Sequence, residues 1–285
     1  VVGCDDSSSA SAGPNDEPGV ESSSSSSGKV TEPDEVTSSS SSVDPISSSS
    51  LQGDKNFSSS SVASSSNSAG NVITYGTMTD SRDGQIYKTV TIGTQTWMAE
   101  NLNYAYTDVP CNYIGYTSDS TSWCYDNDPA NCTKYGRLYT WAAAMDSVGT
   151  WSNNGKGCGY GSTCSPTLPV RGICPEGWLL PTKSEFETLF TAVGGQSTAG
   201  KVLKSQTGWY GSGNGTNAFG FSALPAGNRF NDGSFYSDGN YAYFWSSTEY
   251  NSYFAYYIPL HYSYDNAYLR TNDKYLGFSV RCVKD

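Results

Sequence analysis

The stretch that decides the fold is Trp178-Leu179-Leu180-Pro181-Thr182-Lys183-Ser184-Glu185. Thr182 and Glu185 have the spacing of a capping box, in which the hydroxyl accepts from an early helical amide and the carboxylate returns to the amide of the cap. Apolar residues then recur at helical intervals, and the pair Gly194-Gly195 supplies the positive φ that ends a helix. We therefore predict a helix from Thr182 to this glycine pair.

Strand-like segments lie on both sides of this helix. Residues 86–99 are rich in β-branched and aromatic residues around a Gly93-Thr94 break, which predicts a hairpin. Later strands are predicted at residues 241–247, 253–260 and 277–283. In the last of these, Phe278, Val280 and Cys282 share one face by period two, so the cysteine is expected to face the core.

The remaining segments complete the expected architecture. Residues 138–146 contain an alanine run with apolar residues at helical spacing, which predicts a second, short helix. The Gly- and Asn-rich residues 207–241 are expected to form mostly loops. This order predicts one α+β domain with two main helices, a twisted antiparallel sheet and long loops.

Composition divides the chain at about residue 70. Residues 1–70 hold 27 serines, ten acidic residues, two lysines and one aromatic residue, so we expect a disordered, acidic linker there. Residues 71–285 keep 14 basic and 17 acidic residues, and all 22 tyrosines and seven tryptophans. The folded part has no basic excess, which argues against nucleic acid as a partner.

A membrane anchor is predicted at the start of the linker. Val1-Val2-Gly3-Cys4 resembles the end of a bacterial lipoprotein signal peptide, in which Cys4 carries the lipid. An acidic, Ser-rich tether follows directly, as a surface-anchored domain requires. We expect the protein on the extracellular face of a bacterial outer membrane; a free cysteine at a frayed terminus is the alternative.

Cysteine use also indicates an oxidising compartment. Short spacings favour the disulfides Cys124–Cys132 and Cys158–Cys164, and the remaining long pair is Cys174–Cys282. Cys111 is left unpaired because it has no partner in the two tight cysteine loops. Zinc is disfavoured, since no C-x2-C knuckle occurs and the single histidine is distant in sequence.

Several motifs together resemble one bacterial family, the Fibrobacter succinogenes major paralogous domain. They cover most of the folded part: Asp83-Gly84-Gln85, Gln95-Thr96-Trp97-Met98-Ala99-Glu100-Asn101-Leu102, Cys124-Tyr125, Tyr135-Gly136-Arg137-Leu138-Tyr139-Thr140-Trp141, Cys174-Pro175-Glu176-Gly177-Trp178, Gly220-Phe221-Ser222-Ala223-Leu224-Pro225-Ala226-Gly227, Trp245-Ser246-Ser247-Thr248-Glu249 and Gly277-Phe278-Ser279-Val280-Arg281-Cys282. The resemblance implies a bacterial, often lipid-anchored surface protein of unassigned activity.

A more distant resemblance concerns the fold. The helix start at Leu180-Pro181-Thr182 and the strand Val280-Arg281-Cys282-Val283 are similar to the C-type-lectin-like fold shared with sulfatase-modifying factors. The sequence contains neither the Glu-Pro-Asn nor the Trp-Asn-Asp tripeptide of calcium-dependent sugar-binding lectins. The resemblance therefore implies a fold and no activity.

Catalytic and metal chemistry find little support. His261 stands without a G-x-S-x-G motif, so a satisfied or solvent-facing histidine is favoured. A catalytic pair of carboxylates requires two acidic loop residues to meet in the folded protein, and the default interpretation is that each acid is simply solvated. The candidates are Asp232, Asp238, Glu249 and Asp265.

A calcium site is considered at Asp126-Asn127-Asp128, which offers the oxygen ligands that calcium prefers. The segment lacks the glycine and distal glutamate of an EF-hand, so a turn is favoured. No cofactor is expected.

The aromatic excess points instead to binding. Tyrosine presents an apolar ring with a polar tip, which suits both sugar stacking and protein contact. We expect the contact surface in the Gly/Asn-rich region, at Trp209, Tyr210, Asn228, Arg229, Phe235, Tyr236 and Asp238, with Tyr241 also exposed. Packing of these aromatic residues onto the sheet is the alternative.

These observations favour a non-catalytic surface domain for binding or adhesion, with polysaccharide as the first ligand. A structural or protein-interaction component of the cell envelope, with an envelope protein as partner, is the second hypothesis. An enzyme with a loop-borne carboxylate site is the third.

Overall fold

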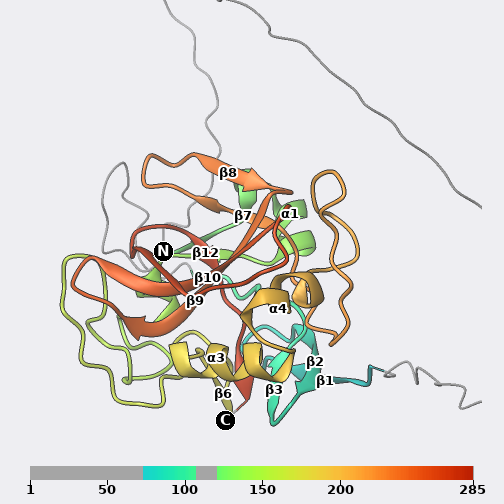
Figure 1. Cartoon of the computed structure of the whole chain (residues 1–285). Helices are drawn as coiled ribbons and strands as arrows, with labels where there is room; N and C mark the ends of the chain where they lie inside the picture. The colour runs from blue at the N-terminus through green and yellow to red at the C-terminus, as the bar shows by residue number, and fades with distance from the viewer. Residues whose placement is uncertain (1–72, 107–120, 285) are drawn as a thin grey trace, which may run out of the picture. The chain divides into compact units, whose positions relative to one another are not determined.

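A computed structural model describes residues 73–106 and 121–284 of the chain (Figure 1). No helix in these two ranges has both the length and the apolar character needed to cross a membrane. The expected linker at residues 1–70 lies outside the described residues, as do Cys4 and Cys111.

The first sheet brings the two ends of the described part together. Its strand order is β1-β2-β3-β13-β6, and its neighbours pair antiparallel. β13 lies between β3 and β6, with Val283 opposite both Trp97 and Leu179. The strands are β1 (Tyr75–Thr79), β2 (Ile86–Ile92), β3 (Gln95–Met98), β6 (Trp178–Leu179) and β13 (Val283–Lys284).

The second sheet has the order β11-β10-β9-β12-β5-β4. All of its pairs are antiparallel except β12 with β9, which is parallel. A separate hairpin, β7–β8, lies against β9 and β12 (Figure 1). The strands are β4 (Ser122–Trp123), β5 (Leu138–Tyr139), β7 (Ala226–Arg229), β8 (Phe235–Asp238), β9 (Tyr241–Glu249), β10 (Phe254–His261), β11 (Arg270–Asp273) and β12 (Phe278–Ser279).

The predicted helix after Thr182 is confirmed as α3 (Lys183–Ala192). Its capping box is complete: the Glu185 amide donates to Thr182 Oγ1 at 3.2 Å, and the Thr182 amide donates to Glu185 Oε2 at 2.6 Å. Gly194 and Gly195 have φ of 99° and 96°, so the helix ends where the sequence predicts. The other helical elements are η1 (Tyr125–Asn127), α1 (Pro129–Tyr135), α2 (Trp141–Ala144) and α4 (Gln196–Leu203).

Buried apolar side chains form three clusters, and the two larger ones lie on opposite sides of β9. One gathers Trp141, Trp245 and Phe278, all nearly or fully buried, with the disulfide Cys174–Cys282. The other gathers side chains of β3, α3, α4, β9 and β10, including Trp97 of β3 and Phe244 of β9. Adjacent β9 residues therefore enter different clusters, because successive side chains of a strand point to opposite faces.

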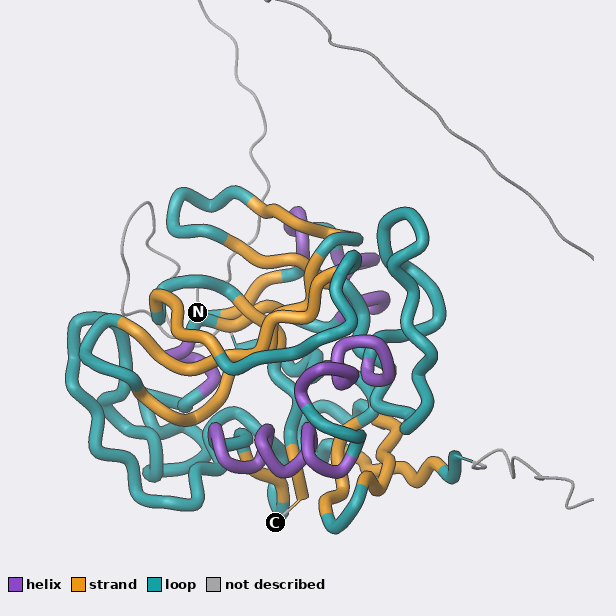
Figure 2. The backbone as a smooth tube through the Cα atoms, in the orientation of Figure 1, coloured by secondary structure: helices purple, strands orange, loops and turns teal. Residues whose placement is uncertain are grey.

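The mixture of helices and mostly antiparallel strands confirms the α+β class. The hairpin predicted at residues 86–99 is confirmed as the pair β2 and β3. Much of the described chain forms loops, as expected (Figure 2). The described residues form four α-helices, of which α3 and α4 are the longest. The second main helix is therefore α4 and not the segment expected at residues 138–146. The expected strand at residues 277–283 is divided into β12 and β13, yet Phe278, Val280 and Cys282 are all buried in the same cluster.

Two local predictions are corrected. The helix expected at residues 138–146 is shortened to α2, because Leu138 and Tyr139 pair with β4 and β12 as strand β5. Residues 207–241 contain the β7–β8 hairpin in addition to loops. At residues 138–146, pairing with distant strands overrides the local helix preference, whereas β7 and β8 are neighbours in the chain that pair as a hairpin.

All three predicted disulfides are confirmed. Cys174 and Cys282 are joined with a Cα–Cα distance of 6.0 Å across 108 residues. The short bridges Cys124–Cys132 and Cys158–Cys164 have Cα–Cα distances of 4.8 and 4.9 Å.

Candidate functional site

A cavity of about 360 Å³ opens where the β7–β8 hairpin meets the second sheet, and we call it the tyrosine groove. Its volume lies in the range of small-molecule sites, about 300–1,000 Å³. None of its lining residues carries an acidic or basic side chain. They are Asn228, Phe230, Tyr236, Ser237, Tyr243, Asn272, Leu276 and Phe278.

Aromatic rings form the rim and the floor of the groove. Phe230 and Tyr236 pack edge to face with centroids 5.2 Å apart, and they remain 40% and 48% exposed. Tyr243 stacks on the buried Phe278 with centroids 4.8 Å apart. Exposed rings above a fixed aromatic floor give a ligand apolar faces to stack on.

The polar side chains of the groove are anchored by the fold. Asn228 is 4% exposed and lies opposite Tyr236 across the hairpin. The Ser237 side chain is hydrogen-bonded to Tyr243, and the Asn272 side chain to Tyr257. Burial raises the pKa of the Tyr243 phenol above its usual range. The groove therefore remains uncharged at neutral pH, with amide and hydroxyl groups as its polar partners.

A row of rings continues outward from the groove, and we call Tyr210, Tyr241, His261, Tyr262 and Tyr264 the aromatic strip. Tyr243 stacks on Tyr241 at 5.1 Å and 9°, and Tyr241 contacts His261 at 4.3 Å. From His261 the row continues to Tyr262 at 4.5 Å and to Tyr264 at 4.6 Å, and Tyr262 contacts Tyr210 at 5.5 Å.

Backbone bonds place the strip beside the β8–β9 turn. The Tyr210 amide donates to Gly239 O at 2.7 Å, and the Tyr262 amide donates to Asn240 O at 2.9 Å. Tyr210 and Tyr264 remain 65% and 56% exposed. Groove and strip thus form one connected aromatic surface.

His261 belongs to this surface as an aromatic ring. Its Nδ1 lies 2.8 Å from Ser263 Oγ. Burial and the nearby charge of Lys204 lower the pKa of His261, so the ring is neutral at neutral pH. Of the two predicted environments, satisfied or solvent-facing, the hydrogen bond to Ser263 corresponds to the first.

The structure brings together some of the predicted ligand residues. Asn228 and Tyr236 line the groove, Tyr210 lies in the strip, and Tyr241 belongs to the strip as a half-buried ring. The expected exposure of Trp209 is wrong. Its side chain is 5% exposed, and its Nε1 donates to Ser205 Oγ at 3.0 Å and to Ala223 O at 3.2 Å.

The other three predicted residues contact the region of β4, η1 and α1. Phe235 packs on Tyr125 with centroids 5.3 Å apart. The Arg229 guanidinium lies 3.8 Å from the Trp123 ring centroid. The Asp238 side chain is hydrogen-bonded to Tyr135. These contacts hold the hairpin in place, so Arg229, Phe235 and Asp238 support the groove without lining it.

Six groove residues were not predicted from the sequence. Tyr243 carried a usable signal, because Tyr241 and Tyr243 alternate with Ala242 and Phe244 and so share one face of a strand. The others come together only through tertiary contacts between the hairpin, β11 and β12: Phe230, Ser237, Asn272, Leu276 and Phe278.

The four candidate carboxylates have separate structural environments. Asp232 Oδ1 accepts from the Ser234 amide at 2.9 Å within the β7–β8 turn. Asp238 contacts Tyr135, as described above, and Asp265 is exposed beside the strip. Within residues 73–106 and 121–284, no three His, Cys, Asp or Glu side chains are grouped so that they could hold a metal ion.

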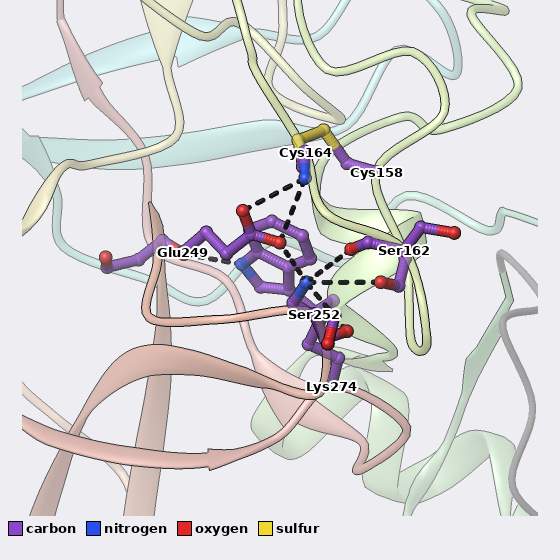
Figure 3. The surroundings of a disulfide bond; sticks show 9 residues. Cys158, Ser162, Cys164, Glu249, Ser252 and Lys274 are labelled. Carbon is purple, nitrogen blue, oxygen red and sulfur yellow. Dashed lines mark hydrogen bonds and ion pairs between the residues drawn. A yellow bond between two sulfur atoms is a disulfide. The ribbon is translucent and has the colours of Figure 1, made fainter.

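Glu249, the fourth candidate, is part of a buried ion pair with Lys274 (Figure 3). Lys274 Nζ also donates to Gly159 O at 3.2 Å, to Ser162 O at 3.1 Å and to Ser252 O at 3.2 Å. The Glu249 carboxylate in turn accepts from the Cys164 amide at 3.0 and 3.1 Å. This pair fastens the Cys158–Cys164 loop to the second sheet.

The candidate calcium residues form a turn and a helix cap. Asp128 Oδ1 accepts from the Ala130 amide at 2.9 Å as the N-cap of α1. Asp126 and Asn127 have φ of 54° and 56°, a conformation that Asp and Asn adopt readily in turns. The structure thus assigns this segment the local role that the sequence favoured.

Comparison with known proteins identifies a family. The family model of the Fibrobacter succinogenes major domain matches residues 90–284, which is more than half of the chain. A search among curated proteins finds no match, and neither does a search among solved structures.

Proposed function

The chain belongs to the Fibrobacter succinogenes major domain family, and from this premise we propose that it is a non-catalytic binding or adhesion domain for a neutral polysaccharide. The observation that best supports a binding function is the connected aromatic surface formed by the tyrosine groove and the aromatic strip. Sugar rings offer C–H faces that stack on aromatic side chains, while amides and hydroxyls orient the sugar hydroxyls.

Two features favour a neutral ligand. No charged side chain lines the groove, so an acidic polysaccharide finds no cation there to offset its desolvation. The folded part also carries a net negative charge, with 14 basic and 17 acidic residues after residue 70. The folded part therefore has no cationic excess that would attract polyanions to this surface at long range.

We also propose a location and a fold type for the protein. Lipid on Cys4 anchors the protein to the extracellular face of the outer membrane, and the Ser-rich residues 1–70 tether the domain at residues 71–285. The Cys158–Cys164, Cys124–Cys132 and Cys174–Cys282 bridges favour an oxidising compartment. The C-type-lectin-like type is supported by β13, which pairs with both β3 and β6 and so brings the ends of the fold together.

Affinity gel electrophoresis against a panel of soluble neutral and acidic polysaccharides tests the function. We expect at least one neutral polysaccharide to retard the wild type, and Tyr236→Ala and Tyr210→Ala to reduce the retardation. Tyr250→Ala is the matched control, because Tyr250 is 59% exposed and lies outside the groove and the strip. Equal retardation of wild type and Tyr236→Ala would contradict the assignment of the site.

The second candidate is a protein-interaction component of the envelope. It is favoured by the same exposed tyrosines, since tyrosine is enriched in protein interfaces. Capture of one defined envelope protein, sensitive to Tyr236→Ala and without any polysaccharide binding, would support it. Release of reducing ends from a retained polysaccharide would support the third hypothesis, an enzyme.

A further inference from the structure

A second cavity, of about 270 Å³, lies between β2, the segment after β3 and helix α1. It shares no lining residue with the tyrosine groove. Its lining is mostly polar, unlike that of the groove. The residues are Tyr75, Gln85, Tyr87, Lys88, Ala99, Glu100, Asn101, Asn103, Cys132, Thr133, Lys134, Tyr135, Gly136, Ser222 and Leu224.

Two lysines from different elements lie at this cavity. Lys88 comes from β2 and Lys134 from the last turn of α1, and both are exposed. Neither ammonium group forms an ion pair or a hydrogen bond with any residue that the structure describes. Lys134 Nζ lies 4.3 Å from the ring centroid of Tyr135, which positions the charge at the cavity.

A third positive charge lies behind the cavity. Asn101, which is 6% exposed, lines the cavity and accepts from Arg281 Nε at 3.1 Å and from Arg281 Nη2 at 2.5 Å. Arg281 is fully buried and also donates to Phe221 O. Burial lowers the pKa of Arg281 to about 9, so the guanidinium remains charged at neutral pH.

The charge of Arg281 is not neutralised by a bonded carboxylate. Its hydrogen-bond acceptors among the described residues are an amide and a backbone carbonyl. Glu100 is the one carboxylate in the cavity lining, and its Oε2 accepts the Lys88 amide at 2.7 Å. On the lining itself two lysines therefore face one carboxylate, and the Arg281 guanidinium adds a cation behind Asn101. Asp238, which is hydrogen-bonded to Tyr135, does not line the cavity, so a bound anion would meet more cations than acids there.

We propose that this cavity binds a small hydroxylated carboxylate, of which a uronic acid unit is the representative. Lys88 and Lys134 pair with the carboxylate, and the amides and hydroxyls of Gln85, Asn103 and Thr133 supply partners for the ligand's hydroxyls. The site is separate from the neutral-sugar surface, so one domain offers one site for a neutral sugar and another for an anionic one.

Isothermal titration of the full chain with glucuronate and galacturonate, against glucose and galactose, tests the proposal. We expect saturable binding of a uronate and none of the neutral sugars. Raising the salt from about 0.05 to 0.5 M should weaken uronate binding, because exposed charges are screened over a few ångströms at high salt. Binding of neutral sugars with equal affinity, or no binding of either uronate, overturns it.

Variants assign the binding to the cavity. Lys88→Gln/Lys134→Gln should weaken uronate binding about tenfold or more. The matched control is Lys156→Gln/Lys284→Gln, which removes two exposed lysines that do not line the cavity. Tyr236→Ala should leave uronate binding unchanged, which separates this site from the tyrosine groove. Equal affinity of wild type and the Lys88/Lys134 variant would place the uronate elsewhere and overturn the proposal.

Discussion

Lys274 and Glu249 form an ion pair beneath the Cys158–Cys164 loop, 25 residues apart in the chain (Figure 3). The lysine side chain is 0% exposed and the glutamate side chain 13%. Lys274 Nζ also lies 4.5 Å from the centroid of the Trp141 ring, in the first core cluster. The pair therefore joins a surface loop to the core.

Removing this lysine should destabilise the fold strongly. Lys274→Met leaves the Glu249 carboxylate and three backbone carbonyls without their cation, so we expect a loss of about 3–5 kcal/mol in the free energy of unfolding. Lys183→Met is the control, because its ion pair with Glu187 is exposed and should contribute less than about 1 kcal/mol. Urea unfolding measures both; similar small losses would contradict the structural role.

Trp209 and Tyr210 should separate stability from binding. Trp209→Ala removes a buried ring from the second cluster and should cost about 3–5 kcal/mol in unfolding free energy. Tyr210→Ala removes a ring that is 65% exposed and should change stability by about 0.5 kcal/mol or less. Polysaccharide retardation should fall in Tyr210→Ala while its melting temperature is kept. A stable Trp209→Ala protein would mean that the buried position is wrong.

The long disulfide should contribute most to stability. On the chain-entropy model, closing the loop of 108 residues between Cys174 and Cys282 contributes about 5 kcal/mol, and the eight-residue loop of Cys124–Cys132 about 2.5 kcal/mol. We expect Cys174→Ala/Cys282→Ala to unfold at much lower denaturant than Cys124→Ala/Cys132→Ala. The reverse order in a denaturant series would contradict this ranking.

Buried tyrosines should make the fold sensitive to alkali. Burial raises the pKa of Tyr87, Tyr135, Tyr139, Tyr243 and Tyr257. In the unfolded chain these phenols lose their protons near pH 10, while the folded state retains them. The folded state then binds more protons, so stability should fall as the pH rises above about 10 and stay unaffected by these groups below it.

Two measurements check the alkaline prediction. Urea unfolding across the pH series should show the decline, and ultraviolet absorbance should show fewer ionised tyrosines in the folded protein than in the unfolded one. Complete tyrosine ionisation near pH 10 with the fold intact would contradict the burial of these side chains.

Cys4 should carry the anchor. Acyl chains stabilise membrane attachment by about 0.8 kcal/mol per buried CH₂, so two or three chains hold a protein firmly. We expect radiolabelled palmitate to enter the wild type in cells and not Cys4→Ser, which should move to the soluble fraction. Cys111→Ser serves as the control. Equal labelling of Cys4→Ser would refute the lipoprotein assignment.

The sequence alone determined the elements whose signals are local. The Thr182–Glu185 capping box and the Gly194-Gly195 stop depend on contacts within a few residues, and both are present in the structure. Cysteine spacing similarly predicted the three disulfides, because two short loops left one long pair. The family was evident from motifs spread along the folded part.

Only the tertiary structure decided which polar and aromatic residues meet. Trp209 and Tyr210 are neighbours of similar chemistry in a Gly-rich segment, yet one is buried beside Ser205 and the other lies on the surface. The groove joins Asn228, Tyr243 and Asn272 from three strands, and Arg281 is buried behind Asn101 although its side chain is charged. Side-chain exposure and long-range pairing depend on how distant segments pack, and no local pattern in the chain encodes that packing.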